Sequence, residues 1–86
     1  MNYVYIARCS DETLYTGWTT NVEKREKVHN SGKGAKYTRS RLPIKIVYVE
    51  ECDSKIEALR REYQVKKMTK NQKENLIRTY NFLENK

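Results

Sequence analysis

Three segments of the chain have the alternating, β-branched and aromatic composition that is typical of β-strands. The first two, Tyr3–Arg8 and Leu14–Thr19, are separated by the polar break Ser10-Asp11-Glu12. A gap of this length suits a β-hairpin with a loop of about three to five residues. The third segment, Ile44–Glu51, gives the strongest strand prediction because apolar and β-branched residues dominate it.

Three capping boxes, in which Ser or Thr is followed three residues later by Glu or Gln, predict the starts of helices. The boxes begin at Thr20, Ser54 and Thr69. The predicted helices run from about Asn21 to Asn30, from the second box to about Met68, and from the third box to about Glu84.

The predicted elements follow the order β-β-α-β-α-α. Between the first helix and the third strand lies a glycine-punctuated basic stretch, Ser31–Pro43, which we expect to be a loop with room for a short helical turn. The order indicates an α+β domain in which helices pack on a small three-stranded sheet. Because a strand, a crossover helix and a further strand also allow a mixed sheet, the pattern leaves the strand direction open.

The composition excludes several classes of protein. At 86 residues, the chain has room for one small domain. Its two cysteines rule out a disulfide-dense scaffold and a four-cysteine zinc site, and its single histidine rules out zinc centres with several imidazoles. No apolar run approaches the ~20 residues of a membrane span, and the N-terminus lacks the pattern of a signal peptide. We therefore expect a cytoplasmic protein with both thiols reduced.

Charge and aromatic content point toward a polyanionic partner. Eighteen Lys and Arg residues against eleven Asp and Glu residues give a net charge of +7. A small basic domain of this kind often binds nucleic acid, although charge alone is equally consistent with solubility. Seven of the nine aromatic residues are tyrosines, which core-building alone does not explain because phenylalanine serves that purpose as well.

Tyrosine, arginine and histidine are the side chains that offer chemistry, because the chain lacks phosphate-binding loops and serine-hydrolase motifs. In the expected hairpin, Tyr5 and Tyr15 lie on the same face of the sheet as diagonal neighbours. Arg25 and His29 are four residues apart, so they share one face of the first helix. Each feature alone is ordinary for a sheet surface or a solvated helix face, and only their combination suggests a site.

Glu62 is the acidic residue that we expect to be partly buried. In the second predicted helix, the apolar stripe consists of Ile56, Leu59 and Tyr63. Glu62 lies at the edge of this stripe, where a carboxylate can hold a metal ion against the sheet. Taken alone, Glu62 is more simply a surface acid or an i,i+4 partner of Lys66.

Together these residues resemble the pattern of the GIY-YIG nucleases. Tyr5 is followed ten residues later by Tyr15-Thr16-Gly17, then by Arg25, by His29 and by a glutamate in a late helix. The resemblance covers about residues 1–78, with 79–86 as the end of the last helix and a tail. The form is similar to small stand-alone bacterial members of the family. The matching segments are residues 3–6, 14–23, 29–39 and 57–63.

The first two family motifs match tyrosines and one glycine. Tyr5 is similar to the tyrosine of the first motif, and Tyr15 and Gly17 are similar to the tyrosine and glycine of the second. The chain departs from the pattern at Tyr3, where the family name has glycine, and at Thr16, where it has isoleucine. These departures bear on rate and substrate more than on fold. The resemblance implies a three-stranded antiparallel sheet flanked by helices.

The remaining matches imply a catalytic role. Arg25 matches the family's helix arginine, His29 the histidine or tyrosine that follows it, and Glu62 the metal-binding glutamate. The implied reaction is hydrolysis of phosphodiester bonds in nucleic acid, with DNA favoured over RNA as the substrate and one Mg²⁺ or Mn²⁺ ion bound by Glu62. Arg25 would clamp the phosphoryl oxygens, and His29 would relay a proton or bond the phosphate. Tyr5 or Tyr15 would be the general base, with a slight preference for Tyr5, because nearby cations lower a tyrosine pKa.

The basic stretch would hold the flanking phosphates, which gives affinity without sequence readout. Its candidate nucleic-acid-binding residues are Lys33, Lys36, Tyr37, Arg39 and Arg41. The expected protein is therefore a structure-selective endonuclease linked to DNA repair or recombination, assumed to be monomeric. One alternative is a nucleic-acid-binding module that keeps the scaffold without useful catalysis. Another is a protein-interaction domain in which the positive charge is incidental.

Overall fold

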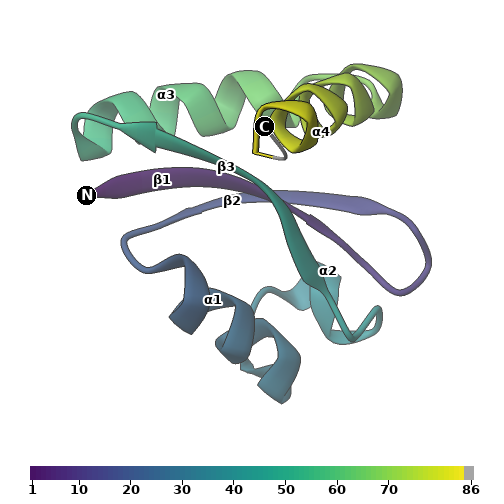
Figure 1. Cartoon of the computed structure of the whole chain (residues 1–86). Coiled ribbons are helices and arrows are strands. Elements are labelled where there is room, and N and C mark those ends of the chain that lie inside the picture. The colour runs from purple at the N-terminus through teal and green to yellow at the C-terminus, as the bar shows by residue number, and fades with distance from the viewer. Residues whose placement is uncertain (85–86) are drawn as a thin grey trace.

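The computed structural model describes the backbone of residues 1–84 and the side chains of residues 1–81. The chain forms a three-stranded antiparallel sheet with helices on both faces (Figure 1). The predicted α+β class and element order are confirmed, and the strand direction is antiparallel. The elements are β1 (Asn2–Arg8), β2 (Leu14–Thr19), α1 (Val22–Val28), the π-helical turn η1 (His29–Lys33), α2 (Lys36–Arg39), β3 (Lys45–Cys52), α3 (Lys55–Lys66) and α4 (Lys70–Glu84). Residues 85–86 of the predicted tail lie outside the described residues.

β1 is the central strand, and both of its faces are covered. In the order β2-β1-β3, Tyr5 pairs with Gly17 on one side and with Val49 on the other. Helices α3 and α4 lie on one face of the sheet, and α1 and α2 lie on the opposite face (Figure 1). Four consecutive residues of β1, Val4–Ala7, are buried as a result. Both faces of the central strand therefore contribute to the core.

The protein has two small cores, one on each face of the sheet. The core on the α3–α4 side contains Val4, Ile6, Tyr48, Cys52, Ala58, Val65 and Ile77. The core on the opposite side contains Tyr5, Ala7, Cys9 and Ile44. Both thiols are free, as predicted, and they belong to different cores. Tyr5 therefore points away from α3 and toward the α1–α2 layer.

The helix caps follow the predicted boxes with one shift. At α4, the Thr69 N–H donates to Gln72 Oε1 at 2.9 Å, and the Gln72 N–H donates to Thr69 Oγ1 at 3.2 Å. At α1, however, the cap is Asn21 rather than Thr20. The side chain of Asn21 accepts a hydrogen bond from the Lys24 N–H at 3.0 Å. Asparagine is a better N-cap residue than threonine, which explains why Asn21 and not Thr20 caps the helix.

The basic stretch Ser31–Pro43 is more regular than a loop. The predicted first helix continues beyond α1 as η1, within which Gly32 has a φ of 83°, a conformation that glycine adopts without strain. The short helix α2 follows. The side chain of Asn30 bonds both backbone groups of Ile44, accepting from the N–H at 2.7 Å and donating to the carbonyl at 3.0 Å. These bonds fasten the stretch to the chain just before β3.

The apolar stripe predicted for α3 is wrong. Ile56 is 64% exposed and Tyr63 is 61% exposed, and Leu59 also faces outward. The face of α3 that packs on the sheet carries Ala58 and Val65. A small alanine allows the helix to approach the sheet closely, so the large apolar residues are left on the outer side. Within residues 1–84, no helix is long and apolar enough to cross a bilayer.

Candidate active site

Tyr5 lies at the centre of the site and is only 1% exposed. Its partner across the β1–β2 ladder is Gly17. A Cβ atom at Gly17 would lie 2.5 Å from the Tyr5 hydroxyl oxygen and 2.7 Å from Cζ, so a larger residue there would collide with the tyrosine side chain. The glycine of the Tyr15-Thr16-Gly17 motif is thus explained by the close approach of the Tyr5 side chain.

The Tyr5 hydroxyl meets two side chains of the first helical segment. His29 Nε2 lies 2.8 Å from the Tyr5 oxygen, and Arg25 Nε donates to the same oxygen at 3.4 Å. Behind the imidazole, His29 Nδ1 lies 2.9 Å from Thr38 Oγ1, which donates its own proton to the Ala35 carbonyl at 2.9 Å. Because the threonine proton is used in that bond, Nδ1 must be the donor. Nε2 therefore accepts a hydrogen bond from the Tyr5 hydroxyl.

His29 is neutral at physiological pH. It is buried, and burial lowers the pKa of its imidazole, with the positive charge of Arg25 acting in the same direction. A neutral imidazole is the form that the Tyr5–His29–Thr38 arrangement requires. Gly34 lies against the ring, and a Cβ atom at that position would collide with His29 Nδ1.

The pKa of Tyr5 is higher than expected from the sequence. Burial raises the pKa of this phenol above its ordinary value, and the charges of Tyr15 and Glu62 add to the increase. The hydrogen bond from Arg25 and its positive charge oppose this increase without outweighing it. Arg25 thus lowers the Tyr5 pKa as expected, but desolvation is the larger effect and the pKa of the free protein is raised overall.

Tyr15 is the more accessible of the two motif tyrosines. It is half-buried, and its ring centroid lies 6.4 Å from that of Tyr5, in agreement with the predicted diagonal pairing. The ring of His29 meets it edge-on at 5.5 Å. Tyr37 stacks on it with a centroid distance of 6.0 Å and an interplanar angle of 23°. The Tyr15 hydroxyl makes no hydrogen bond with any residue that the structure describes, so it is available to a ligand.

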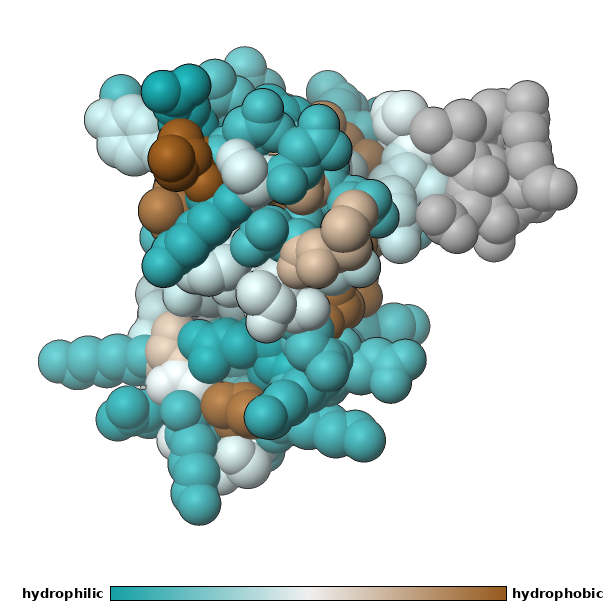
Figure 2. Space-filling view, turned by 90° about the vertical axis from the view of Figure 1, so that its left-hand side faces the viewer, coloured by the Kyte–Doolittle hydropathy of each residue, from teal (hydrophilic) through white to brown (hydrophobic). Residues whose placement is uncertain are grey.

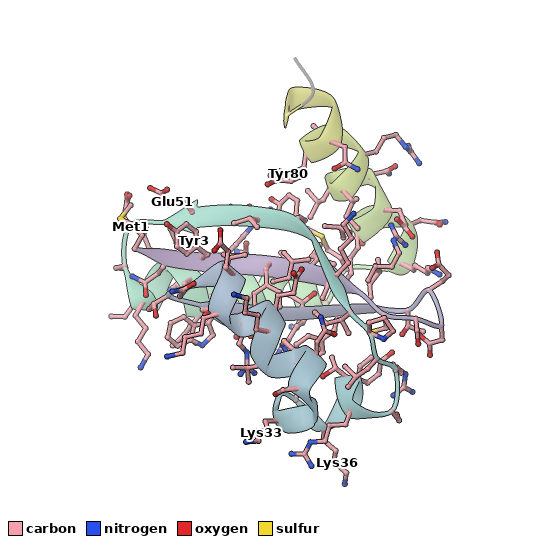
Figure 3. All side chains as sticks on the ribbon, turned by 60° about the horizontal axis from the view of Figure 1, so that its bottom comes forward. Met1, Tyr3, Lys33, Lys36, Glu51 and Tyr80 are labelled. Atoms are coloured by element: carbon pink, nitrogen blue, oxygen red, sulfur yellow. The ribbon has the colours of Figure 1, made fainter. Side chains whose placement is uncertain are left out.

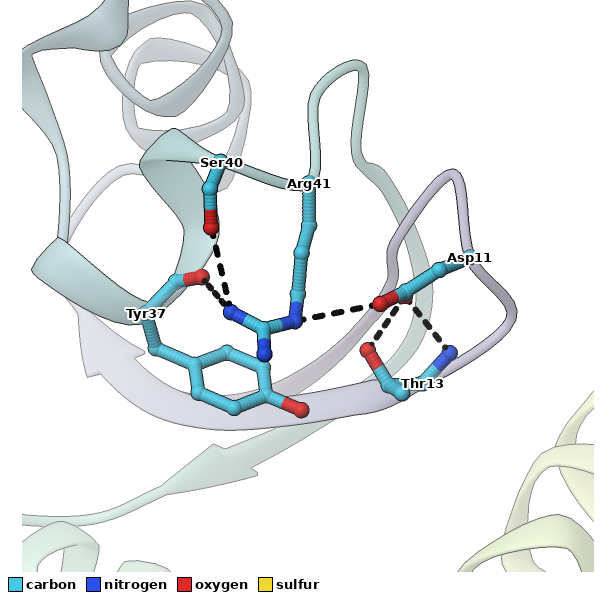
Figure 4. A network of polar contacts seen from close by, with 5 residues as sticks. All are labelled: Asp11, Thr13, Tyr37, Ser40 and Arg41. Atoms are coloured by element: carbon cyan, nitrogen blue, oxygen red, sulfur yellow. Dashed lines mark hydrogen bonds and ion pairs between the residues drawn. The ribbon is translucent and has the colours of Figure 1, made fainter.

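Arg41 holds the Tyr37 ring in place. Its guanidinium carbon lies 4.0 Å from the centroid of that ring. Its Nε donates to Asp11 Oδ2 at 3.1 Å, and its Nη1 donates to the Tyr37 carbonyl at 2.8 Å and to Ser40 Oγ at 3.3 Å (Figure 4). Hydrogen bonds from Thr13, together with Arg41, lower the pKa of Asp11. Arg41 is thus already engaged in contacts within the protein.

The other basic residues of the stretch are free. Lys33, Lys36 and Arg39 are exposed and pair with no residue among those described. Lys33 and Lys36 project from the end of the molecule formed by η1 and α2 (Figure 3). Figure 2 shows long hydrophilic side chains extending from the half of the molecule that lies opposite α3 and α4. This surface can contact a polyanion without first breaking ion pairs.

Glu62 belongs to α3, which covers the face of the sheet opposite to His29. Its side chain is 15% exposed and pairs with Lys66 at 3.5 Å. The predicted partial burial is observed, although Glu62 lies on the inner side of α3 with Ala58 and Val65 rather than at the edge of an inward apolar stripe. Its charge contributes to the raised pKa of Tyr5, so the two groups interact electrostatically.

One carboxylate fits an Mg²⁺ or Mn²⁺ ion only if water and substrate supply the other ligands. No cluster of three His, Cys, Asp or Glu side chains that could hold a metal occurs within the described residues. Mg²⁺ commonly binds through one or two carboxylates, several waters and substrate phosphates. Glu62 is compatible with that mode of binding. It does not belong to a site in which protein side chains alone would surround the metal among the described residues.

The structure thus brings Tyr5, Tyr15, Arg25 and His29 together on one face of the sheet. Sequence reasoning assigned no role to Thr38 or Gly34, although both lie within the segment 29–39 that carried the resemblance. A buried threonine nine residues from a histidine gives no periodic signal. Its role follows only from the turn that η1 and α2 make together.

Comparison with known proteins identifies the family of the chain. The family model described as the GIY-YIG catalytic domain matches residues 1–75. The chain belongs to the GIY-YIG family. A UPF0213 protein of Clostridium perfringens is 64% identical over 77 residues, which cover 90% of this chain and 83% of that protein.

Two solved structures have the same GIY-YIG fold. The solution structure of a UPF0213 protein from Bacillus halodurans is 51% identical, with a TM-score of 0.58 over 92% of this chain and 85% of that one. The solution structure of a protein from E. faecalis is 38% identical, with a TM-score of 0.62 over 94% of this chain and 86% of that one. Small proteins of this length that consist of a GIY-YIG domain are therefore a recurrent form.

Proposed function

We propose that this protein is a metal-dependent endonuclease that hydrolyses phosphodiester bonds in DNA. The hydrogen bond from the Tyr5 hydroxyl to the neutral imidazole of His29, at 2.8 Å, carries the proposal. A phenol with a raised pKa is a poor base alone, because its anion is disfavoured by burial. The imidazole removes that difficulty, since it accepts the tyrosine proton as the tyrosine takes up another.

In the proposed reaction, a water molecule loses one proton to the Tyr5 oxygen while the Tyr5 proton moves to His29 Nε2. The water oxygen bonds to phosphorus, the bond from phosphorus to the 3′-oxygen breaks, and this oxygen takes a proton from solvent. The products are a 5′-phosphate and a 3′-hydroxyl. His29 leaves the step as an imidazolium and returns its proton to solvent before the next turnover.

Arg25 and Tyr15 bind the reacting phosphate in this proposal. Arg25 is half-buried and uses its Nε for Tyr5, which leaves its two Nη groups for the phosphoryl oxygens. Tyr15 is half-buried and its hydroxyl makes no hydrogen bond to a described residue, so in this proposal it donates to the same group. A divalent ion held by Glu62 would, when bound, supply positive charge to stabilise the leaving 3′-oxygen.

The basic stretch gives the protein its affinity for DNA. The exposed residues Lys33, Lys36 and Arg39 are proposed to contact flanking phosphates, with Tyr37 presenting a ring that is 40% exposed. Arg41 contributes by holding Tyr37 rather than as a free cation. Because backbone contacts carry no sequence information, we propose selection for DNA structure, as in repair or recombination, by a cytoplasmic monomer.

The burial of Tyr5 and His29 favours a second candidate function. Both side chains are almost fully enclosed. A hydrogen-bonded pair of this kind stabilises the contact between the sheet and the α1–α2 layer even if it takes no part in catalysis. The protein would then be a nucleic-acid-binding module that keeps the GIY-YIG scaffold without useful catalysis.

A cleavage assay separates the two functions. Wild-type protein in excess is incubated with branched, flapped and single-stranded DNA and with matched RNA, in Mg²⁺, in Mn²⁺ and in EDTA. If the protein is a nuclease, we expect DNA products with 5′-phosphate ends that form only in the presence of a divalent ion. Binding to the same substrates with no cleavage in either ion would instead support the binding module.

A further inference from the structure

A surface pocket adjoins the candidate active site at the free edge of β2. Its volume is about 350 Å³, at the lower end of the range for small-ligand sites. Because β2 is an edge strand, side chains from both faces of the sheet reach this pocket. The lining residues come from β2, α2, α3 and α4 and are Leu14, Tyr15, Thr16, Tyr37, Lys66 and Lys73.

The Thr16 hydroxyl in this pocket has no partner. Thr16 is 3% exposed, and its Oγ1 makes no hydrogen bond to any described residue. A buried hydroxyl without a partner is unfavourable for folding, and in native proteins nearly every such group is bonded to protein, water or a ligand. Valine would fill the same space without this cost. Thr16 therefore brings a buried donor without a described acceptor to the wall of the pocket.

Two lysines bring positive charge to the same place. Lys73 of α4 is half-buried, and its side chain forms no ion pair or hydrogen bond within the described part of the chain. Lys66 of α3 is close enough that its charge lowers the pKa of Lys73, in addition to the effect of burial. Lys66 pairs with Glu62 at 3.5 Å, whereas the ammonium group of Lys73 has no acidic partner among the described residues. A bound anion would relieve the repulsion between the two lysines.

The aromatic wall of the pocket is rigid. Tyr15 is packed between the rings of His29 and Tyr37, and Arg41 covers the outer face of Tyr37. Asp11 fixes that arginine. The hydroxyl of Tyr15 makes no hydrogen bond among the residues that the structure describes, so the wall adds a further donor to those of Thr16 and the lysines. The pocket thus offers several donors and two cations from elements whose positions are already fixed.

We infer that this pocket binds a backbone phosphate of the nucleic acid, next to the phosphate that is cleaved. Tyr15 lines both the pocket and the candidate active site, and Lys66 follows Glu62 by one turn of α3, about 5.4 Å along the helix axis. A strand whose reacting phosphate lies beside Tyr15 would therefore carry a neighbouring phosphate toward Lys66, Lys73 and Thr16. The inference rests on the proposed function for its choice of ligand.

The first test uses inorganic phosphate as the probe. In ¹³C- and ¹⁵N-edited NMR spectra of the whole protein, we expect phosphate to perturb Thr16, Lys66 and Lys73 in a saturable manner. The perturbation should be weaker in Thr16→Val, which keeps every charge. Perturbation spread evenly over the exposed lysines, or none at Thr16, would overturn the site.

The second test measures binding to a fluorescent DNA oligonucleotide in EDTA at several salt concentrations. Lys73→Gln should lower affinity and reduce the log–log salt slope by roughly 0.9 if the phosphate is in a duplex. Lys70→Gln is the matched control, because it removes the same charge from an exposed position on the same helix. Thr16→Val should weaken binding severalfold without changing the slope. Circular dichroism melts establish that each variant is folded.

If Lys73→Gln and Lys70→Gln changed DNA affinity and its salt slope equally, Lys73 would contribute only to the overall positive charge. That result would overturn the inference. The inference would also be overturned if phosphate bound at Thr16 but the pocket variants bound DNA as tightly as wild type. The pocket would then bind a free anion and not a DNA phosphate. Because both tests omit the metal, they do not depend on cleavage. If the protein binds DNA through this pocket but never cuts it, the nuclease proposal is wrong and the inference about the pocket still holds.

Discussion

Gly17 faces Tyr5 directly across the antiparallel ladder, and a Cβ atom at Gly17 would lie 2.5 Å from the tyrosine oxygen. The Tyr5 side chain is buried, and its hydroxyl is hydrogen-bonded to His29 and Arg25, so moving it away from residue 17 would disturb both bonds. Gly17→Ala should therefore destabilise the protein by about 1–3 kcal/mol, the usual cost of overpacking. Urea unfolding measures the change.

Gly32 provides the control for this experiment. Its φ of 83° is tolerated by asparagine, and nothing lies within 4 Å of its added Cβ. Gly32→Asn should change stability by less than about 1 kcal/mol. If Gly17→Ala were as mild as Gly32→Asn, the close approach of the Tyr5 side chain would not be a constraint on the fold.

Tyr5→Phe and Tyr15→Phe make the same chemical change at sites with different hydrogen bonding. Tyr5 donates to His29, whereas the Tyr15 hydroxyl is unbonded within the described residues. Tyr5→Phe should slow single-turnover cleavage by about 10²–10⁴-fold, the usual contribution of general base catalysis. It should also cost about 1–3 kcal/mol of stability, because the buried Nε2 loses its partner. A larger loss of rate in Tyr15→Phe would transfer the role of base to Tyr15.

Arg25→Ala tests whether the arginine acts in the transition state. We expect it to bind DNA within about tenfold of wild type but to cleave about 10²–10³-fold more slowly, as when one preorganised donor is removed. Arg25→Lys should restore little activity, because an ammonium cannot make the planar two-point contact. Full recovery of the rate at saturating protein would show that Arg25 contributes binding alone.

Glu62→Gln removes the charge of the proposed metal ligand and keeps its shape. The variant should fold, should bind DNA in EDTA at least as well as wild type, and should lose divalent-dependent cleavage. Mn²⁺-induced broadening of NMR signals near residue 62 should disappear as well. Glu57→Gln, on an exposed turn of the same helix, should leave both properties intact. Cleavage by Glu62→Gln at the wild-type rate would place the metal elsewhere.

The only histidine of the chain makes the pH dependence of stability easy to interpret. Folding lowers the pKa of His29 below its ordinary value of about 6.5, so the unfolded state takes up the proton first as pH falls. Stability should therefore be complete above about pH 6.5 and should decrease as the pH falls from there toward the folded-state pKa. Urea midpoints between pH 5 and 8 measure this decrease. In His29→Gln the decrease over this range should vanish, and its persistence would assign it to other groups.

The sequence was sufficient to predict the element order and the meeting of Tyr5 and Tyr15, because alternation and hairpin length determine which strand residues share a face. It was also sufficient to place Arg25 and His29 together, since helical spacing is local. It was misleading for α3, where Ile56 and Tyr63 suggested a buried stripe. Which side of a helix is buried depends on how closely the helix approaches its neighbours. In α3 the small side chain of Ala58 allows close packing on the sheet, so that side is buried.

Other features depend on tertiary contacts that leave no local pattern. The hydrogen bond between Thr38 and His29 requires the turn between η1 and α2. The engagement of Arg41 with Asp11 joins residues 30 positions apart, so a residue counted as a free cation in the sequence is a structural one in the fold. The raised pKa of Tyr5 reflects desolvation, which cannot be estimated before both faces of the sheet are known to be covered.

The two cysteines offer independent reporters of motion in the two halves of the molecule. Cys9 is enclosed on the side of the sheet that carries the tyrosine–histidine pair, and Cys52 on the side that carries α3 and α4. A thiol reagent reaches either sulfur only when its own layer opens. Alkylation rates of the native protein, resolved by mass for each cysteine, would thus show whether DNA slows the breathing of one layer or of both.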